Sequence, residues 1–333
     1  MRPTMHGCLI LLGLALLAQG ARADTAASIQ AMHKDWMAPR AVEFTAAAEG
    51  LAQALEAYCG KQDPQAALDQ PRQAWRMALD RWERLSAVAI GPVLEQRMQR
   101  RIDFMPTRSR MILKAIKSAP ATAKDMELIG TPAKGFPALE WLLWTQPIQS
   151  ATPACAYAVQ VAKEIELEAR GMEQGYRQAA SRSMDGEATK TALSEWVNQW
   201  VGGLERLRWA NMEMPVRVAG TAGPDAVPEY ARQASGVTAA SWAAQWNLLR
   251  TLAVGQGNGS FAALLTGQGQ DKLAESLAQA VAKADAGMAG LAETEKDRIL
   301  VAAQDLAALK RLVENRVAPA LGVSIGFSDS DGD

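Results

Sequence analysis

Apolar residues recur with a helical period along almost the whole chain. In the clearest case, residues 71–90, Trp75 and Trp82 share one face and Gly91-Pro92 ends the segment. Strand-like alternation of apolar and polar positions is almost absent, so the pattern predicts an all-α protein. The predicted helices are residues 26–58 with a bend near Pro39, 71–90, 93–101, 107–117, 136–144, 154–180, 187–216, 237–254, 271–288 and 294–321.

The first 23 residues have the pattern of a cleavable signal peptide. Arg2 supplies a positive charge, residues 8–18 form an apolar run too short to span a bilayer, and Ala21-Arg22-Ala23 fits a cleavage site. The apolar run begins at Cys8 instead of preceding a cysteine, so the pattern is not that of a lipoprotein. No later stretch is long and apolar enough to span a membrane. We therefore expect a mature chain from Asp24 in the periplasm of a Gram-negative cell, or secreted, without a transmembrane segment.

Charge and composition narrow the class of protein. The 35 Lys and Arg residues nearly balance the 36 Asp and Glu residues, which argues against a nucleic-acid-binding protein. The net charge changes from -1 to -3 when Arg2 and Arg22 leave with the signal peptide. A hydrophobic content of 49% with 21% charged residues is ordinary for a globular protein and excludes wholesale disorder.

The mature chain keeps two cysteines and one histidine. Cys59 and Cys155 are a candidate disulfide, because an exported compartment permits one, but the sequence alone leaves the pairing open. His33 is the single histidine, and we expect it to lie at the surface or at a helix cap. A zinc site with two histidines is therefore excluded from the mature chain.

A stretch that contains Gly and Pro, residues 219–229, is the predicted linker between residues 24–218 and residues 230–333. A weak internal repeat supports two similar helical bundles that face one another. Residues 82–91 align with residues 246–255, with Trp, Leu, Ala and Gly at matching positions. An internal duplication is therefore one hypothesis.

The segment of residues 135–144 stands out because Glu140 is its single ionisable group. Apolar neighbours on all sides predict that Glu140 is buried, and a buried carboxylate must be protonated or paired. Pro137 suits the first position of a helix, which places Glu140 close to the positive end of that helix. Glu140 is therefore a candidate site residue.

Several segments resemble the imelysin-like family, also called the M75 peptidase family. Gly135-x-x-x-x-Glu140 followed by Trp-Leu-Leu-Trp is similar to the Gly-x-His-x-x-Glu helix of that family. Residues 101–106, Arg-Ile-Asp-Phe-Met-Pro, are similar to its Arg-Ile-x-Phe-Trp-Pro segment. Cys155-Ala156-Tyr157 and residues 326–333 resemble later landmarks, in the family's order.

The resemblance implies an exported all-α protein with two four-helix-bundle-like halves and a site in the cleft between them. The family includes an insulin-cleaving membrane protease and proteins of periplasmic iron uptake. Pro137 occupies the family's His position and has no ligand atom, so the resemblance indicates a divergent member. Zinc peptidase chemistry is not expected here.

We therefore expect an exported, non-enzymatic binding or accessory protein in iron acquisition. Glu140, Asp103, Arg101 and Arg108 are expected to line the cleft between the halves. If a metal binds, Glu140 and Asp103 are its candidate ligands, and oxygen ligands suit iron or calcium better than zinc. The expected partners are a metal ion or other envelope proteins of iron uptake.

Two alternatives remain open. One is an M75 metallopeptidase with unusual ligands, and the other is a helical scaffold without a ligand. A separate hypothesis is that Glu140 is buried, charged and paired with a basic group of the segment from Arg101 to Arg108. The run with Asp329, Asp331 and Asp333 is either a solvated tail or, as the family resemblance suggests, a segment folded back on the bundle.

Overall fold

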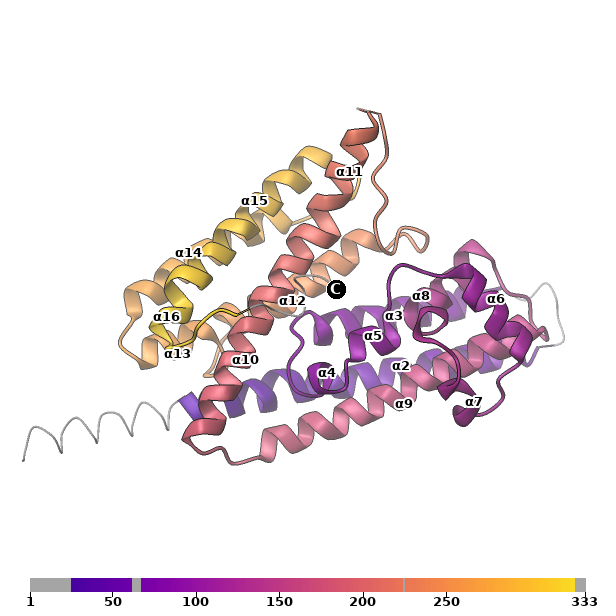
Figure 1. Cartoon of the computed structure of the whole chain (residues 1–333), viewed down its shortest axis with the longest axis horizontal. Helices are drawn as coiled ribbons and strands as arrows, with labels where there is room; N and C mark the ends of the chain where they lie inside the picture. Colours follow the sequence, from indigo (N-terminus) through magenta and orange to yellow (C-terminus); the bar gives the residue numbers. More distant parts are fainter. Residues whose placement is uncertain (1–24, 62–66, 224, 327–333) are drawn as a thin grey trace, which may run out of the picture.

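The computed structural model describes residues 25–61, 67–223 and 225–326, and every regular element in these ranges is a helix (Figure 1). This confirms the all-α prediction. The predicted signal peptide and residues 329–333 lie outside the described residues. No helix in the described ranges is long and apolar enough to cross a membrane.

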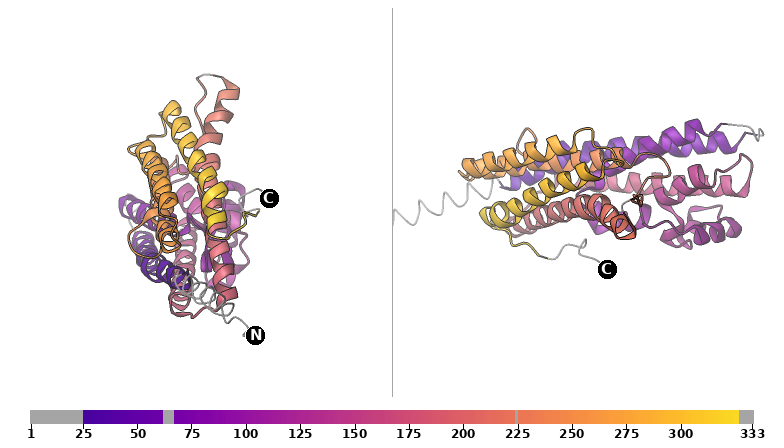
Figure 2. Two further views of the ribbon diagram at one scale, coloured as in Figure 1. Left: turned by 90° about the vertical axis from the view of Figure 1, so that its left-hand side faces the viewer. Right: turned by 90° about the horizontal axis from the view of Figure 1, so that it is seen from above.

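Three long helices form the framework of the first half. α2 (Ala38–Cys59) packs along α9 (Pro153–Ser181) and along α3 (Asp69–Ser86). Figure 2 shows the long helices of this half running side by side. Trp75 and Trp82 are fully buried on α3, as their spacing of seven residues predicts.

A run of short helices covers one side of this framework (Figure 1). α8 packs against α3 and α9 and ends at Glu140. The short elements are α4 (Pro92–Glu95), α5 (Met98–Ile102), α6 (Ser109–Ser118), α7 (Ala123–Glu127), η2 (Thr131–Ala133), α8 (Gly135–Glu140) and η3 (Trp141–Thr145).

The second half is a group of antiparallel helices. α10 (Gly186–Glu205) continues without a break through η4 (Arg206–Glu213) into α11 (Met214–Ala222). The first four residues of the predicted linker are therefore helical. The remaining elements are α12 (Thr238–Val254), α13 (Phe261–Gly267), α14 (Asp271–Met288), α15 (Lys296–Leu312), η5 (Val313–Val317) and α16 (Ala318–Ala320).

α10 and η4 pack mainly with the helices of the second half. Both elements pack against α12 and α15, although the linker predicted at residues 219–229 places them in the first bundle, residues 24–218. By packing, the chain passes from the first group of helices to the second between α9 and α10. This connection spans only residues 182–185, where the sequence shows a softer break than at residues 219–229.

Wide π-helical turns mark the helices near prolines. η1 (Met32–Met37), η3, η4 and η5 each end two residues before a proline. A proline has no N–H to donate and its ring crowds the carbonyl four residues earlier, so a wider turn before it relieves the conflict. The prolines are Pro39, Pro147, Pro215 and Pro319.

The two halves meet where α3 packs on α12 and α10 passes the end of α3. A Cβ on Gly203 would lie 2.0 Å from the carbonyl oxygen of Ala87, so only glycine allows this approach. Within the second half, the indole N–H of Trp200 on α10 donates to the carbonyl of Leu249 on α12 at 2.8 Å. Residues 82–91 and 246–255, which align in sequence, begin on α3 and α12, the two helices of this contact.

Cys59 and Cys155 form a disulfide, with their Cα atoms 5.6 Å apart. The bond ties the end of α2 to the start of α9. It closes a loop with a sequence separation of 96 residues, and a loop of that length restricts the unfolded chain strongly.

The variant Cys59→Ser/Cys155→Ser is expected to lose about 4 kcal/mol of unfolding free energy, because its unfolded state gains the entropy of the open loop. Urea unfolding followed by circular dichroism measures this loss. Wild-type protein treated with reductant serves as the control and is expected to unfold like the variant. Equal midpoints for the variant and the oxidised wild type would contradict the prediction.

Candidate functional site

A buried arginine lies at the centre of three carboxylates where the two halves meet. Arg232 is only 4% exposed. One terminal nitrogen, Nη2, donates to Asp103, while Nε lies 3.8 Å from Glu83 Oε1 and Nη1 lies 3.9 Å from Glu140 Oε2. We call these four residues the junction cluster.

Separate elements bring the members of the junction cluster together. Glu83 lies on α3, Asp103 directly follows α5, and Glu140 ends α8. Arg232 lies in the turn before α12 with a φ of 66°, in the left-handed region that side chains other than glycine rarely adopt. The hydroxyl of Thr238 donates to the carbonyl of Ala231 at 2.8 Å and helps to fix this turn.

Each carboxylate of the junction cluster also accepts a hydrogen bond from a neighbouring group. The donors are Trp82 Nε1 to Asp103 Oδ2 at 2.9 Å, Ser241 Oγ to Glu83 Oε1 at 2.8 Å, and the backbone N and Oγ of Ser235 to Glu140 Oε1 at 3.0 and 2.6 Å. These bonds stabilise charge on the carboxylates inside the protein.

The structure corrects the expected partner of Glu140. Glu140 is buried at 6% exposure, as predicted, but the guanidinium that faces it belongs to Arg232. Arg101 is exposed and pairs with a carboxylate of α9, and Arg108 is exposed just before α6. Ile102 is buried next to Arg101, and neighbouring residues of a helix point in different directions, so Arg101 faces outward.

Gly135 and Pro137 shape the helix that carries Glu140. Gly135 has a φ of 72°, and a Cβ there would lie 2.1 Å from the carbonyl oxygen of Ile102. This position therefore requires glycine. Pro137 is the third residue of α8 instead of the first, but it is still in the first turn, where backbone N–H groups have no partner within the helix.

A cavity of about 180 Å³ opens beside the junction cluster, and we call it the junction cavity. Asp103, Glu83 and Arg232 line it, whereas Glu140, Arg101 and Arg108 do not. The other polar side chains in its wall come from both halves and are Ser86, Gln99, Arg206, Asn211, Ser241 and Gln245.

Hydrogen bonds hold much of this wall in place. Arg206 donates to Gln99 Oε1 at 3.1 Å and to the carbonyl of Ala87 at 2.9 Å. Asn211 donates to Gln245 Oε1 at 2.9 Å. Nη1 of Arg232 is buried, has no hydrogen-bond acceptor among the described residues, and faces Glu140 Oε2 at 3.9 Å, outside the lining of this cavity.

Burial changes the acid–base behaviour of the junction cluster. Burial and the neighbouring Asp103 carboxylate raise the pKa of Glu83 to about 7, against the opposing effect of Arg232. For Arg232, burial favours a lower pKa, but the three carboxylates outweigh it and raise the pKa above its ordinary value. Burial lowers the pKa of Arg206.

The junction cluster does not fit a resident catalytic metal. The Arg232 guanidinium lies among the three carboxylates, where a cation would have to bind. In the described ranges no group of three or more His, Cys, Asp or Glu side chains is arranged to hold a metal ion. His33 is partly buried beside Tyr176, with ring centroids 6.3 Å apart, and not at a helix cap.

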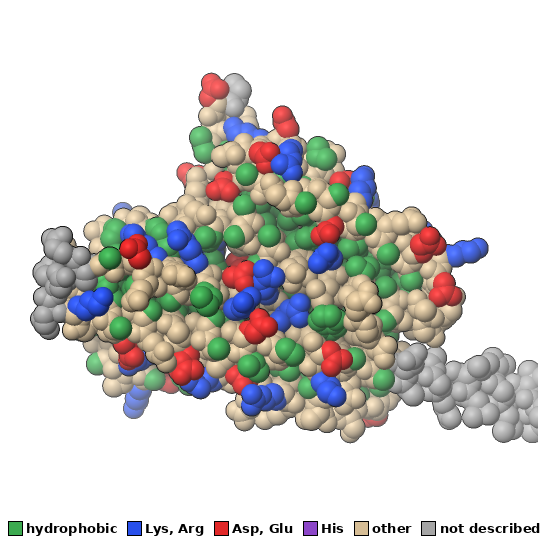
Figure 3. All heavy atoms as spheres, turned by 180° about the vertical axis from the view of Figure 1, so that it is seen from behind, with side chains coloured by type: hydrophobic (Ala, Val, Ile, Leu, Met, Phe, Trp, Pro, Cys, Tyr) green, Lys and Arg blue, Asp and Glu red, His purple; other side chains and the backbone are tan. Residues whose placement is uncertain are grey.

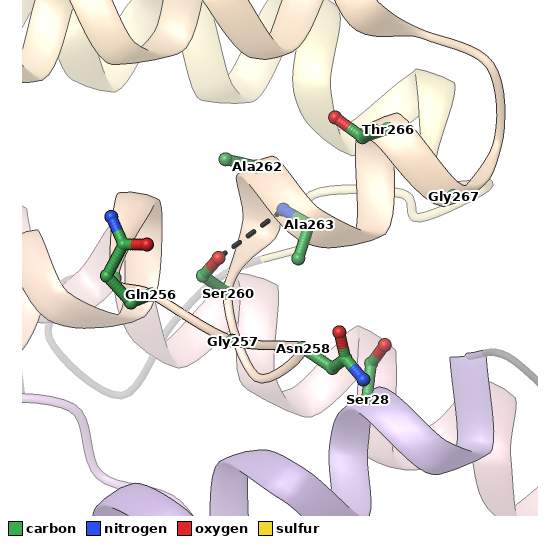
Figure 4. A pocket seen from close by; sticks show the side chains of 10 residues that line it. Ser28, Gln256, Gly257, Asn258, Ser260, Ala262, Ala263, Thr266 and Gly267 are labelled. Atoms are coloured by element: carbon green, nitrogen blue, oxygen red, sulfur yellow. Dashed lines mark hydrogen bonds between the residues drawn. The ribbon is translucent and has the colours of Figure 1, made fainter.

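A second cavity, of about 440 Å³, lies where the loop before α13 faces Ser28 (Figure 4). Gln256, Asn258 and Ser260 line it together with small residues, and Ser260 accepts a hydrogen bond from the backbone of Ala263 at 3.3 Å. None of its lining residues carries an ionisable side chain. The junction cavity is therefore the better candidate site.

These observations define a class of protein: all-α chains with two groups of helices and with charged side chains buried where the groups meet. The chain belongs to the imelysin family, because the family model described as Imelysin, Peptidase M75, matches residues 37–318. The family resemblance of the sequence is thereby confirmed.

Relatives and solved structures agree with this membership. Iron-regulated protein A of Synechococcus elongatus is 32% identical over 158 residues, which span 46% of this chain and 41% of that protein, less than half of its length. An imelysin-like protein from Psychrobacter arcticum has a TM-score of 0.78 at 20% identity, covering 92% of this chain and 98% of that one. A protein described as an iron-regulated protein A precursor, from Parabacteroides distasonis, has a TM-score of 0.75 at 12% identity, covering 90% and 95%. The two structures show a shared fold.

Sequence reasoning found Glu140 and Asp103 but missed Glu83 and Arg232. Glu83 follows Trp82 on α3, one position from the predicted apolar face, and its ionisable side chain there was a usable signal. Arg232 lies in an irregular stretch just beyond the predicted linker, and nothing in the local sequence marks it as buried.

Arg232→Met is expected to cost about 3–5 kcal/mol of unfolding free energy, because it leaves three carboxylates without their buried counter-charge. Arg108→Met is the matched control and is expected to change stability by less than about 0.5 kcal/mol, because Arg108 is exposed. Urea unfolding at neutral pH measures both. Similar stability for the two variants would contradict the central position of Arg232.

Glu83 gives a pH dependence of known sign. Its pKa is higher in the folded protein, about 7, than in the unfolded chain, so the stability linked to its proton is present at low pH and declines as pH rises towards 7. Glu83→Gln is expected to remove this decline.

The measurement is the unfolding free energy of wild type minus that of Glu83→Gln, at several values between about pH 5 and pH 8. The difference between the two proteins is needed because other groups also change stability with pH. Burial lowers the pKa of His33 to about 4, so its contribution to stability rises with pH, opposite to that of Glu83. The difference should fall with pH up to about 7 and then level off. A difference that rises with pH would refute this assignment.

Proposed function

We propose that this chain is an exported, non-catalytic binding protein in iron acquisition, and that the junction cavity holds its ligand. The family membership and the name of the Synechococcus elongatus relative, Iron-regulated protein A, support a role connected with iron. The signal-peptide pattern and the disulfide between Cys59 and Cys155 support export.

The observation that carries this proposal is the wall of the junction cavity. It combines buried charged groups with amide and hydroxyl side chains from both halves. Ligand pockets typically use a few such groups to fix the orientation of a small molecule. The carboxylates, by contrast, already accept hydrogen bonds from Trp82, Ser235 and Ser241.

This donor pattern favours a small polar ligand with oxygen acceptors over a bare metal ion. Iron then reaches the protein as cargo of such a ligand or through another envelope protein. Catalysis is not part of the proposal, because the carboxylates are engaged with Arg232 and with hydrogen-bond donors.

Titration calorimetry of the purified protein with ferric citrate, citrate, calcium and zinc tests the proposal. We expect binding of ferric citrate and none of zinc. Asn211→Leu removes a polar group from the wall of the junction cavity and is expected to weaken binding about tenfold. The matched control, Asn258→Leu, changes an amide of the second cavity and is expected to leave binding unchanged.

The other outcomes are equally informative. If Asn258→Leu weakens binding and Asn211→Leu does not, the ligand lies in the second cavity. If neither iron complex nor citrate binds, the scaffold alternative is favoured. Cleavage of a protein substrate by wild type that Glu140→Gln abolishes would favour the peptidase alternative.

A further inference from the structure

A strongly basic stretch interrupts the charge balance of the chain. Over the face shown in Figure 3, Lys and Arg side chains lie interspersed with Asp and Glu side chains, as the totals of 35 and 36 lead one to expect. Between residues 104 and 124 there are five basic residues and no acidic one. They are Arg108, Arg110, Lys114, Lys117 and Lys124.

These five side chains are exposed, and none forms an ion pair with another described residue. On α6, Arg110, Lys114 and Lys117 share one face, because residues three and four apart are neighbours on a helix. Ile112 and Ala115 are buried on the opposite face. The helix therefore presents a row of unpaired positive charges to solvent.

Apolar side chains are exposed within the same surface. Leu128 is 85% exposed, Leu113 is 48% exposed and Met111 is 39% exposed. Met111, Lys114 and Leu128, together with Asp125 of α7, also line a groove of about 440 Å³ between α6 and the segment that follows α7. We call the five basic residues and these three apolar residues the α6–α7 face.

The α6–α7 face lies at one end of the elongated molecule, opposite the end formed by α13 and α16 (Figure 1). The position is also remote from the junction cavity, whose lining includes none of these residues.

We propose that the α6–α7 face binds an anionic phospholipid surface. Lys and Arg side chains next to such a surface each strengthen binding through the negative surface potential. Leu128, Leu113 and Met111 can each insert on its own between lipid headgroups, while the long basic side chains reach the phosphates.

This occupant fits better than an acidic protein, because the exposed apolar residues alternate with basic ones. A protein partner requires a continuous, complementary contact area, whereas a lipid interface accepts scattered apolar side chains singly. The binding is peripheral and independent of the function proposed for the junction cavity.

Sedimentation with vesicles tests the proposal on the purified protein. We expect it to bind vesicles of phosphatidylcholine mixed with phosphatidylglycerol and not vesicles of phosphatidylcholine alone. Binding is expected to weaken strongly at high salt, because salt screens charges at exposed surfaces. Failure of the wild type to sediment with the anionic vesicles at low salt overturns the proposal.

Two sets of variants locate the contact. Lys114→Glu/Lys117→Glu is expected to lower the partition coefficient at least about tenfold. The matched control, Lys272→Glu/Arg311→Glu, makes the same change of charge at exposed positions of the second half, and we expect less than about a twofold effect. An equal effect of both pairs would show that net charge, not this face, controls binding, and would overturn the proposal.

A second readout separates lipid from protein partners. Leu128→Ser is expected to weaken vesicle binding without changing its salt dependence. Because the Leu128 side chain is exposed, the variant is expected to fold like the wild type, which thermal unfolding checks. Soluble polyglutamate serves as a model of an acidic polypeptide. If it binds the wild type while anionic vesicles do not, the face recognises an acidic protein and the lipid proposal is wrong.

Discussion

The buried ion pairs of Arg232 are the interaction on which the joining of the two halves depends. Removing a guanidinium from water costs several kcal/mol, and only close carboxylates offset that cost. The three carboxylates all come from the first half, on or beside α3, α5 and α8, while Arg232 precedes α12 in the second half. Within the junction cluster, neither half has balanced charge by itself. Separation of the halves would therefore expose apolar surface and would also leave the carboxylates and Arg232 without their partners.

The positions of α5 and α8 in the first half meet the same requirement, which is to place carboxylates around the Arg232 guanidinium. A Cβ at Gly135 would collide with the carbonyl of Ile102, so glycine lets α8 approach α5 closely. Asp103 is the residue after Ile102, and Glu140 is five residues after Gly135. The close approach at Gly135 thus brings two carboxylates of different helices towards one guanidinium.

The regular helices were predictable because their apolar stripes are long. Residues 271–288 were predicted as a helix, and α14 has these bounds; α12 begins one residue later than predicted. The short elements were less predictable. Residues 93–101 were predicted as one helix, but Arg97 adopts a φ of 51°, which separates α4 from α5. α13 follows a glycine-rich loop and is only seven residues long, too short to show a period.

Only part of the candidate site could be predicted from the sequence, because its residues lie far apart along the chain. A buried carboxylate can be recognised from its apolar neighbours, as Glu140 was, because those neighbours lie within one helix. Its partner is chosen by tertiary packing: Arg232 and Asp103 are 129 residues apart, and Ser235 and Glu140 are 95 apart. The basic residues near in sequence, Arg101 and Arg108, were the natural choice and were wrong.

The charge of the junction cavity limits what it can recognise. Two acidic side chains, Asp103 and Glu83, and two basic ones, Arg232 and Arg206, line the cavity, and burial raises the pKa of Glu83 to about 7. Near neutral pH the net charge around the cavity therefore depends on a single proton. A site so close to neutrality has little long-range attraction for either a cation or an anion. Its selectivity must come from directed hydrogen bonds, and the amides of Asn211 and Gln245 are among the groups placed to provide them.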